Sequence, residues 1–248
     1  MSLAVKPNRI KLTVLSAGAL GATLRAVLFA TGVDGKGLLV SGHWADTSVW
    51  ILTAAMALVL FLLLGKFRGT NQYGDAFPKS ILGAMGCILA SCGILLNGAP
   101  EGTEGNLALA ELVLRFGSAV ALIAIGYCRF SGKKPLFLFH GAVSLYLALR
   151  MICLYRLWSA DPQLQNYCFS LGAYVALMLT AYQFAAFDAE LANPRSLWIS
   201  GLSAVYLCML ALVGSEPFLM LCCGIWVLTN LSSPARPKKK SSYTKEEA

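Results

Sequence analysis

The chain has 248 residues, of which 57% are apolar and 13% are charged, and its mean hydropathy is +0.67. A soluble domain carries roughly 25% charged residues, so this composition excludes a large water-covered domain. The formal charge of +8 does not indicate nucleic-acid binding, because the basic residues stand at the ends of apolar segments rather than on one continuous basic face with aromatic residues.

Eight apolar segments follow one another along the chain, and each is a candidate membrane span because about 20 apolar residues cross about 30 Å of hydrocarbon. They are residues 10–33, 46–66, 79–97, 107–130, 135–158, 166–188, 196–214 and 217–231. The first segment is longer than the apolar core of a cleavable signal peptide, so we expect it to remain as the first membrane helix. The last is short for a full crossing and is also compatible with a re-entrant or tilted element, but we count it as a span.

Basic residues gather in every second connection between these segments, whereas the connections in between are neutral or acidic. The basic positions are Lys6, Arg9 and Lys11, then Lys66, Arg68 and Lys79, then Arg129, Lys133 and Lys134, then Arg195, and finally Arg236 with Lys238, Lys239 and Lys240. Cytoplasmic loops keep Lys and Arg, and translocated loops avoid them. The pattern therefore predicts an even number of crossings with both termini in the cytoplasm.

The sequence thus predicts an all-α bundle of about eight transmembrane helices in one domain, residues 1–231, followed by a disordered basic cytoplasmic tail, residues 232–248. The expected partners are the lipid bilayer, anionic lipids at the tail, and a membrane protein or a second copy of the chain. Small residues four apart, such as Gly18, Ala22 and Ala26, permit close helix contact. Short loops without an organelle signal favour the cytoplasmic membrane of a bacterium.

Three arginines within the spans, Arg25, Arg115 and Arg150, are predicted at one depth. Each lies about 8 residues from the outer end of its segment, which places it about 12 Å below the outer boundary at 1.5 Å per residue. Glu111 and Arg115 are spaced i,i+4 and are expected to form an ion pair on one helix face. Arg25 and Arg150 then have no intramembrane carboxylate at their depth, which leaves a surplus of two positive charges.

Such a surplus suits an anionic ligand, because the planar guanidinium group binds carboxylate or phosphate through two hydrogen bonds. We therefore expect an outward-facing ligand site with hydroxyl groups from nearby tyrosines. The candidate residues are Arg25, Glu111, Arg115 and Arg150, with Tyr146, Tyr174 and Tyr206. The alternative is that these arginines clamp helices together or extend their long stems to the membrane interface.

The remaining polar residues point less clearly to chemistry. His43 is expected to be solvated in an outer loop, and His140 is expected to be a packing histidine, with a proton relay as the alternative. Asp188 and Glu190 are expected to form a surface ion pair with Arg195. The eight cysteines have no C-x-x-C spacing and are interpreted as small apolar packing residues, so neither a metal nor a cofactor is expected.

Three classes of function remain open. The first is a transporter, or a transporter subunit, for an anionic or amphiphilic solute or a lipid headgroup. The second is a non-catalytic interaction or regulatory protein that binds a partner through its helices. The third is a membrane-embedded enzyme that modifies lipid, which we rank last because the chain contains none of the H-E-x-x-H, G-x-S-x-G and phosphate-loop signatures.

Overall fold

The computed structural model describes residues 7–32, 39, 42–65, 67, 72–100, 104–159 and 167–231. These residues form nine α-helices, which confirms the predicted all-α class for the described part of the chain. The helices are α1 (Pro7–Thr31), α2 (Trp44–Leu64), α3 (Tyr73–Ala76), α4 (Ile81–Leu96), α5 (Gly105–Ser131), α6 (Phe137–Trp158), α7 (Cys168–Asp188), α8 (Pro194–Ala211) and α9 (Pro217–Asn230).

Five of the described helices, α1, α2, α5, α6 and α7, are long and apolar enough to cross a membrane. The apolar helices α4 and α9 are shorter, with 16 and 14 residues, so they measure about 24 Å and about 21 Å at 1.5 Å per residue. Helix α3 is a single turn that lies between α2 and α4. The arrangement indicates a multi-pass membrane protein.

Several helices begin and end where the sequence carries ordinary end signals. The hydroxyl of Ser80 accepts a hydrogen bond of 3.1 Å from the N–H of Gly83 and so caps the start of α4. Pro194 and Pro217 open α8 and α9, where the missing N–H of proline leaves no helical bond unmade. Gly132 ends α5 with a positive φ of 76°, a conformation that glycine adopts without strain.

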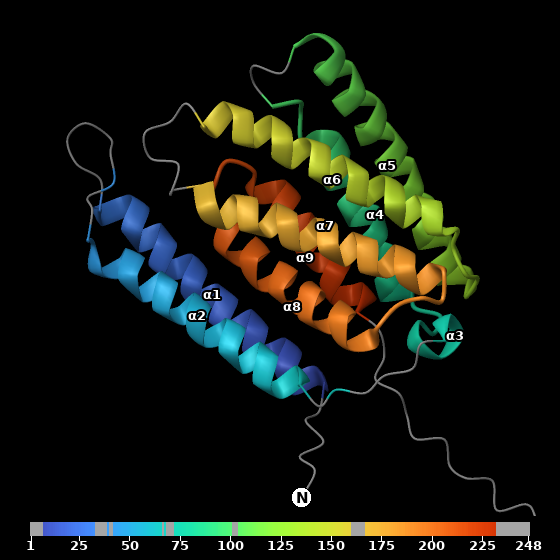
Figure 1. The fold of residues 1–248 in the computed structure, drawn as a ribbon, viewed down its shortest axis with the longest axis horizontal. Coiled ribbons are helices and arrows are strands. Elements are labelled where there is room, and N and C mark those ends of the chain that lie inside the picture. The colour runs from blue at the N-terminus through green and yellow to red at the C-terminus, as the bar shows by residue number, and fades with distance from the viewer. Residues whose placement is uncertain are drawn as a thin grey trace, which may run out of the picture.

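Helices α4 to α9 pack in a ring in which each contacts the next and α9 returns to α4, while α1 and α2 form a hairpin attached mainly through α1 and α8 (Figure 1). Glycines permit the close approaches. A Cβ on Gly86 of α4 would lie 2.1 Å from the Thr229 hydroxyl oxygen of α9, and a Cβ on Gly18 would lie 2.9 Å from Met209 of α8. Ala26, the last residue of the predicted small stripe on α1, is exposed instead.

Successive long helices run in opposite directions, so their termini gather at two ends of the bundle (Figure 1). At one end Lys11 of α1 donates a hydrogen bond of 3.2 Å to the carbonyl of Leu228 in α9, and Asn230 of α9 donates one of 2.9 Å to the carbonyl of Gly83 in α4. We call this the basic end; it also carries Arg9, Lys79, Lys133, Lys134 and Arg195. The opposite end, where α9 begins, is called the Glu216 end.

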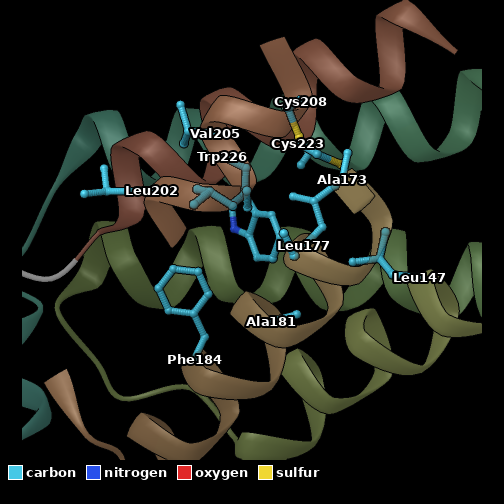
Figure 2. Close-up of a cluster of buried hydrophobic side chains, with 14 of the residues drawn as sticks. Leu147, Ala173, Leu177, Ala181, Phe184, Leu202, Val205, Cys208, Cys223 and Trp226 are labelled. Atoms are coloured by element: carbon cyan, nitrogen blue, oxygen red, sulfur yellow. The ribbon is translucent and has the colours of Figure 1, made fainter. Parts of the chain in front are cut away.

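The core of the ring is apolar and centres on Trp226 of α9, which is 1% exposed. Figure 2 shows its indole ring directed toward Leu177 and Phe184 of α7, with Cys223 one turn along α9 beside Ala173. The outer faces are apolar as well: Leu58, Phe61 and Leu62 of α2 are exposed, as expected for side chains in contact with lipid.

Some predicted features lie outside the described residues. They are the tail 232–248, Lys6, Lys66 and Arg68 of the basic clusters, and Asp34 and Asp161 of the outer connections. The disordered tail and its contact with anionic lipid therefore stay predictions.

Candidate functional site

Arg150 of α6 is the centre of a buried ionic cluster at the Glu216 end. Its side chain is 1% exposed, and its Nη1 donates hydrogen bonds of 2.9 Å to Glu111 Oε1 of α5 and 2.7 Å to the carbonyl oxygen of Gly98. Its Nη2 donates to Oε1 of Glu216, which immediately precedes α9. One guanidinium group thus joins α5, α6, the end of α4 and the start of α9.

Glu216 completes this cluster because its carboxylate points into the ring instead of capping its own helix. It makes no side-chain capping bond to α9, and it accepts a second hydrogen bond from the hydroxyl of Tyr174 in α7. Tyr174, one of the predicted site residues, thus contacts this cluster. Glu216 itself was missed, because a single acidic residue before a proline in a short connection gives no sign that it is buried.

Arg115 lies at the edge of the same cluster. Its Nη1 donates a hydrogen bond of 3.3 Å to the carbonyl of Asn97, and its Nε is 3.9 Å from Glu111 Oε2. The predicted Glu111–Arg115 pair exists, but the short contact of Glu111 is with Arg150. The prediction that Arg150 has no carboxylate partner is wrong, since two glutamates bond to it. Two arginines and two glutamates leave the cluster without a formal surplus of charge.

Arg25 is not among the residues that bond within this cluster. Its Nη1 donates a hydrogen bond of 2.7 Å to the carbonyl oxygen of Leu210 in α8, and its guanidinium carbon is 5.0 Å from the centre of the Phe169 ring. It therefore ties α1 to α8 and α7. The Tyr206 hydroxyl lies 3.0 Å from that of Thr53, which joins α8 to α2 instead.

Tyr146, another predicted site residue, lies on α6 one turn before Arg150. It is 0% exposed, and its hydroxyl has no hydrogen-bond partner among the described residues. It is close enough to Arg150, Glu111 and Cys223 to interact with them electrostatically. A buried hydroxyl that lacks a partner is unfavourable in an apolar surrounding, so Tyr146 marks a place where a polar molecule would be stabilised.

A second buried polar cluster lies at the basic end. His140 Nδ1 of α6 is 2.5 Å from Asp188 Oδ2 of α7, and the two side chains are 7% and 1% exposed. His140 was interpreted as a packing histidine, and the structure gives it a buried carboxylate partner 48 positions away. The expectation that Asp188 forms a surface ion pair with Arg195 is wrong, because Asp188 is buried against His140. Glu190 pairs with Lys134 at 2.7 Å on the exposed surface.

Arg129 and Asn230 lie beside this pair and face the same small cavity. Arg129 Nε donates a hydrogen bond of 2.9 Å to Asn230 Oδ1, and its guanidinium carbon is 4.8 Å from the centre of the Phe77 ring. The cavity has a volume of about 10 Å³ and is lined by Tyr73, Phe77, Ile125, Arg129, His140, Phe184, Asp188 and Asn230. Arg129 was predicted to belong to a cytoplasmic basic cluster, and its burial was not predicted.

The described residues offer no group of three or more His, Cys, Asp or Glu side chains that could hold a metal ion. Their cysteines are free thiols, and Cys87, Cys153, Cys208, Cys222 and Cys223 are buried. Comparison with family models, curated proteins and solved structures gives no match. The functional argument therefore rests on the two buried clusters and on what lies between them.

Proposed function

We propose that the protein spans the cytoplasmic membrane eight times, with both termini and the basic end in the cytoplasm. Two observations support this topology. The starts of α1, α4 and α6 and the ends of α5, α7 and α9 lie at the end where the described basic residues gather, and the carbonyl of Leu228 in α9 accepts a hydrogen bond from Lys11 in α1. Basic residues mark the cytoplasmic side of a membrane protein.

We propose further that the protein is a carrier for a small anionic or amphiphilic solute, with α9 along the permeation path. The observation that carries this proposal is that α9 has 14 residues and that buried polar groups lie at both of its ends. Its length of about 21 Å is less than the hydrocarbon thickness of about 30 Å. In many transporters, helices that do not span the whole membrane present their ends to the substrate near the middle of the bilayer.

Residues halfway along this path also fit a polar solute. Tyr146 lies between His140 and Arg150 on α6, and its buried hydroxyl has no hydrogen-bond partner among the described residues. The charges flank this position on both sides, with Arg150 and its glutamates toward the Glu216 end and His140 with Asp188 toward the basic end. Ionisable groups within a membrane protein usually face a substrate or ion pathway.

The cluster at the Glu216 end suggests how an anion would enter. Glu216 lies in the connection before α9, and its carboxylate occupies Arg150 Nη2 and the Tyr174 hydroxyl. A solute carboxylate or phosphate would make the same two contacts, so we propose that it displaces Glu216, while Glu111 remains on Arg150. Release of Glu216 would free the start of α9 to move, which links solute binding to a change of conformation.

Uptake into liposomes that contain the full-length protein tests this proposal. The probes are a labelled short monocarboxylate, a tricarboxylate, inorganic phosphate and an alkyl sulfonate. We expect at least one to accumulate above protein-free liposomes. Glu216→Gln should then raise the apparent affinity for that anion about tenfold, because it removes a competing charged hydrogen bond. Glu104→Gln, at the exposed start of α5, serves as the matched control, and no uptake of any probe would contradict a carrier of anions.

A non-catalytic interaction protein is the second candidate, and the internal bonds of the arginines favour it. Arg25 and Arg150 both donate to groups of the protein itself, as expected of residues that hold helices together. An apolar cavity of about 50 Å³ between α1, α8 and α9 would then belong to a surface for lipid or a partner helix.

A further inference from the structure

The His140–Asp188 pair differs from the other ion pairs of the described residues in its position on its helices. His140 lies in the first turn of α6, and Asp188 is the last residue of α7. A helix N-terminus disfavours positive charge and a C-terminus disfavours negative charge. Both helix ends therefore oppose the ionised pair, while their mutual attraction at 2.5 Å favours it. The pair thus combines a close contact between two buried side chains with helix ends that each disfavour its charges.

The cavity at the basic end lies beside this pair, and His140 and Asp188 are among its lining residues. A volume of about 10 Å³ is close to the space that one water molecule needs. Polar groups line it from four helices: Arg129 of α5, His140 of α6, Asp188 of α7 and Asn230 of α9. Arg129 is 6% exposed, and its Nη1 has no hydrogen-bond partner among the described residues. This donor is placed to hold a water molecule beside the pair.

The other titratable groups around the pair do not replace it as the proton carrier. Arg129 has a guanidinium group, which offers hydrogen-bond donors and no acceptor. Tyr73 of α3 lies outside the candidate spans, and burial raises its pKa to about 12, an effect that Arg129 partly offsets. Cys128 of α5 is close enough to Asp188 to interact with it. Phe184 and Trp226 face the imidazole from α7 and α9 at 5.2 Å and 6.4 Å between ring centres.

We infer that the His140–Asp188 pair is a proton-binding site that water reaches through the cavity beside Arg129. When the site loads, the bound water passes one proton to the pair and regains one from the bulk solvent. When the site empties, the proton returns to the solvent by the same route, and no electrons are transferred. The claim that this proton is the coupling ion of the carrier rests on the proposed function. The claim that the pair binds a proton does not. The site would couple transport because α6 and α7 also carry Arg150 and Tyr174 of the opposite cluster.

The chain contains two histidines, and this permits a direct test on the full-length protein in lipid bilayers. His43→Gln leaves His140 as the single imidazole, whose ring nitrogen signals are then followed by ¹⁵N NMR. We expect a reversible change between the imidazolium and neutral patterns over about pH 5 to pH 8, together with magnetisation transfer from water. Asp188→Asn should alter this pH response, and Glu190→Gln, an exposed carboxylate two residues away, should leave it unchanged.

Two results would overturn the inference: a His140 signal that stays the same over this pH range, or a pH response that Asp188→Asn leaves intact. Failure of the proton-binding site can be distinguished from failure of the proposed carrier function. A fixed signal in liposomes that still accumulate an anion removes the proton site and keeps the carrier. A response that depends on Asp188, in a protein that transports none of the probes, keeps the proton site and removes the carrier.

Discussion

Replacement of Arg150 by glutamine is expected to lower the free energy of unfolding by about 3–5 kcal/mol, the usual cost of removing one partner from a buried ion pair. Arg150 is 1% exposed and bonds to Glu111 and Glu216. Its loss leaves the buried carboxylate of Glu111 and the largely buried carboxylate of Glu216 without their principal cation. Denaturant titration of the purified protein in mixed micelles measures the change.

A matched control and a compensating variant test whether the loss of stability comes from the uncompensated charges. Arg156→Gln, at an exposed position on the same helix, should change the free energy of unfolding by less than about 0.5 kcal/mol. Adding Glu111→Gln and Glu216→Gln to Arg150→Gln removes the uncompensated charges and should recover more than half of the loss. If Arg150→Gln alone were as mild as the control, the buried cluster would not exist as described.

Trp226→Ala is the second change with a large expected effect, a loss of about 3–5 kcal/mol for a fully buried aromatic residue. The ring lies among side chains of α7 and α8 (Figure 2), and its removal leaves a cavity that these helices cannot readily fill. The loss comes from packing, because lipid is as apolar as the core and gives little hydrophobic drive to helix association. Thermal unfolding with lipid present measures it.

Trp44→Ala provides the comparison, since Trp44 is 60% exposed at the start of α2. It should cost less than about 1 kcal/mol. Similar losses for both tryptophans would contradict the placement of Trp226 at the centre of the ring.

Much of the fold was predictable because span length and charge act locally. Each apolar segment produced a helix, and end signals that are visible in the sequence, such as Pro194, Pro217 and Gly132, lie at helix ends in the structure. The shortness of α9 was also visible, since residues 217–231 are few for a crossing. Helix partners were not predictable in this way, because the ring from α4 to α9 depends on contacts between residues far apart in the sequence.

The candidate site was also predictable only where the signal is local in the sequence. Glu111, Arg115, Arg150 and Tyr174 could be singled out because polar and ionisable residues in apolar segments are conspicuous, and the structure places all four in one cluster. Their role in ligand binding stays a prediction. Glu216 and Asp188 were missed or misplaced because they stand next to connections, where a carboxylate is ordinarily solvated. Only tertiary packing turns them inward, 66 and 48 positions away from their partners Arg150 and His140.

If the protein is a carrier as we propose, a path along α9 opens alternately to the two sides of the membrane. Cys223 is a natural reporter for it, because it lies seven residues from both Glu216 and Asn230 and is 1% exposed. Two other native cysteines serve as side controls: Cys168, exposed at the start of α7, and Cys128, half-buried near the end of α5.

Three proteins, each with one of these cysteines and the other seven replaced by alanine, are treated from one side at a time with a negatively charged, membrane-impermeant thiol reagent. We expect Cys168 to react only from outside, Cys128 only from the cytoplasm, and Cys223 from both sides. A Cys223 that reacts from one side only, or from neither while both controls react, would contradict the carrier.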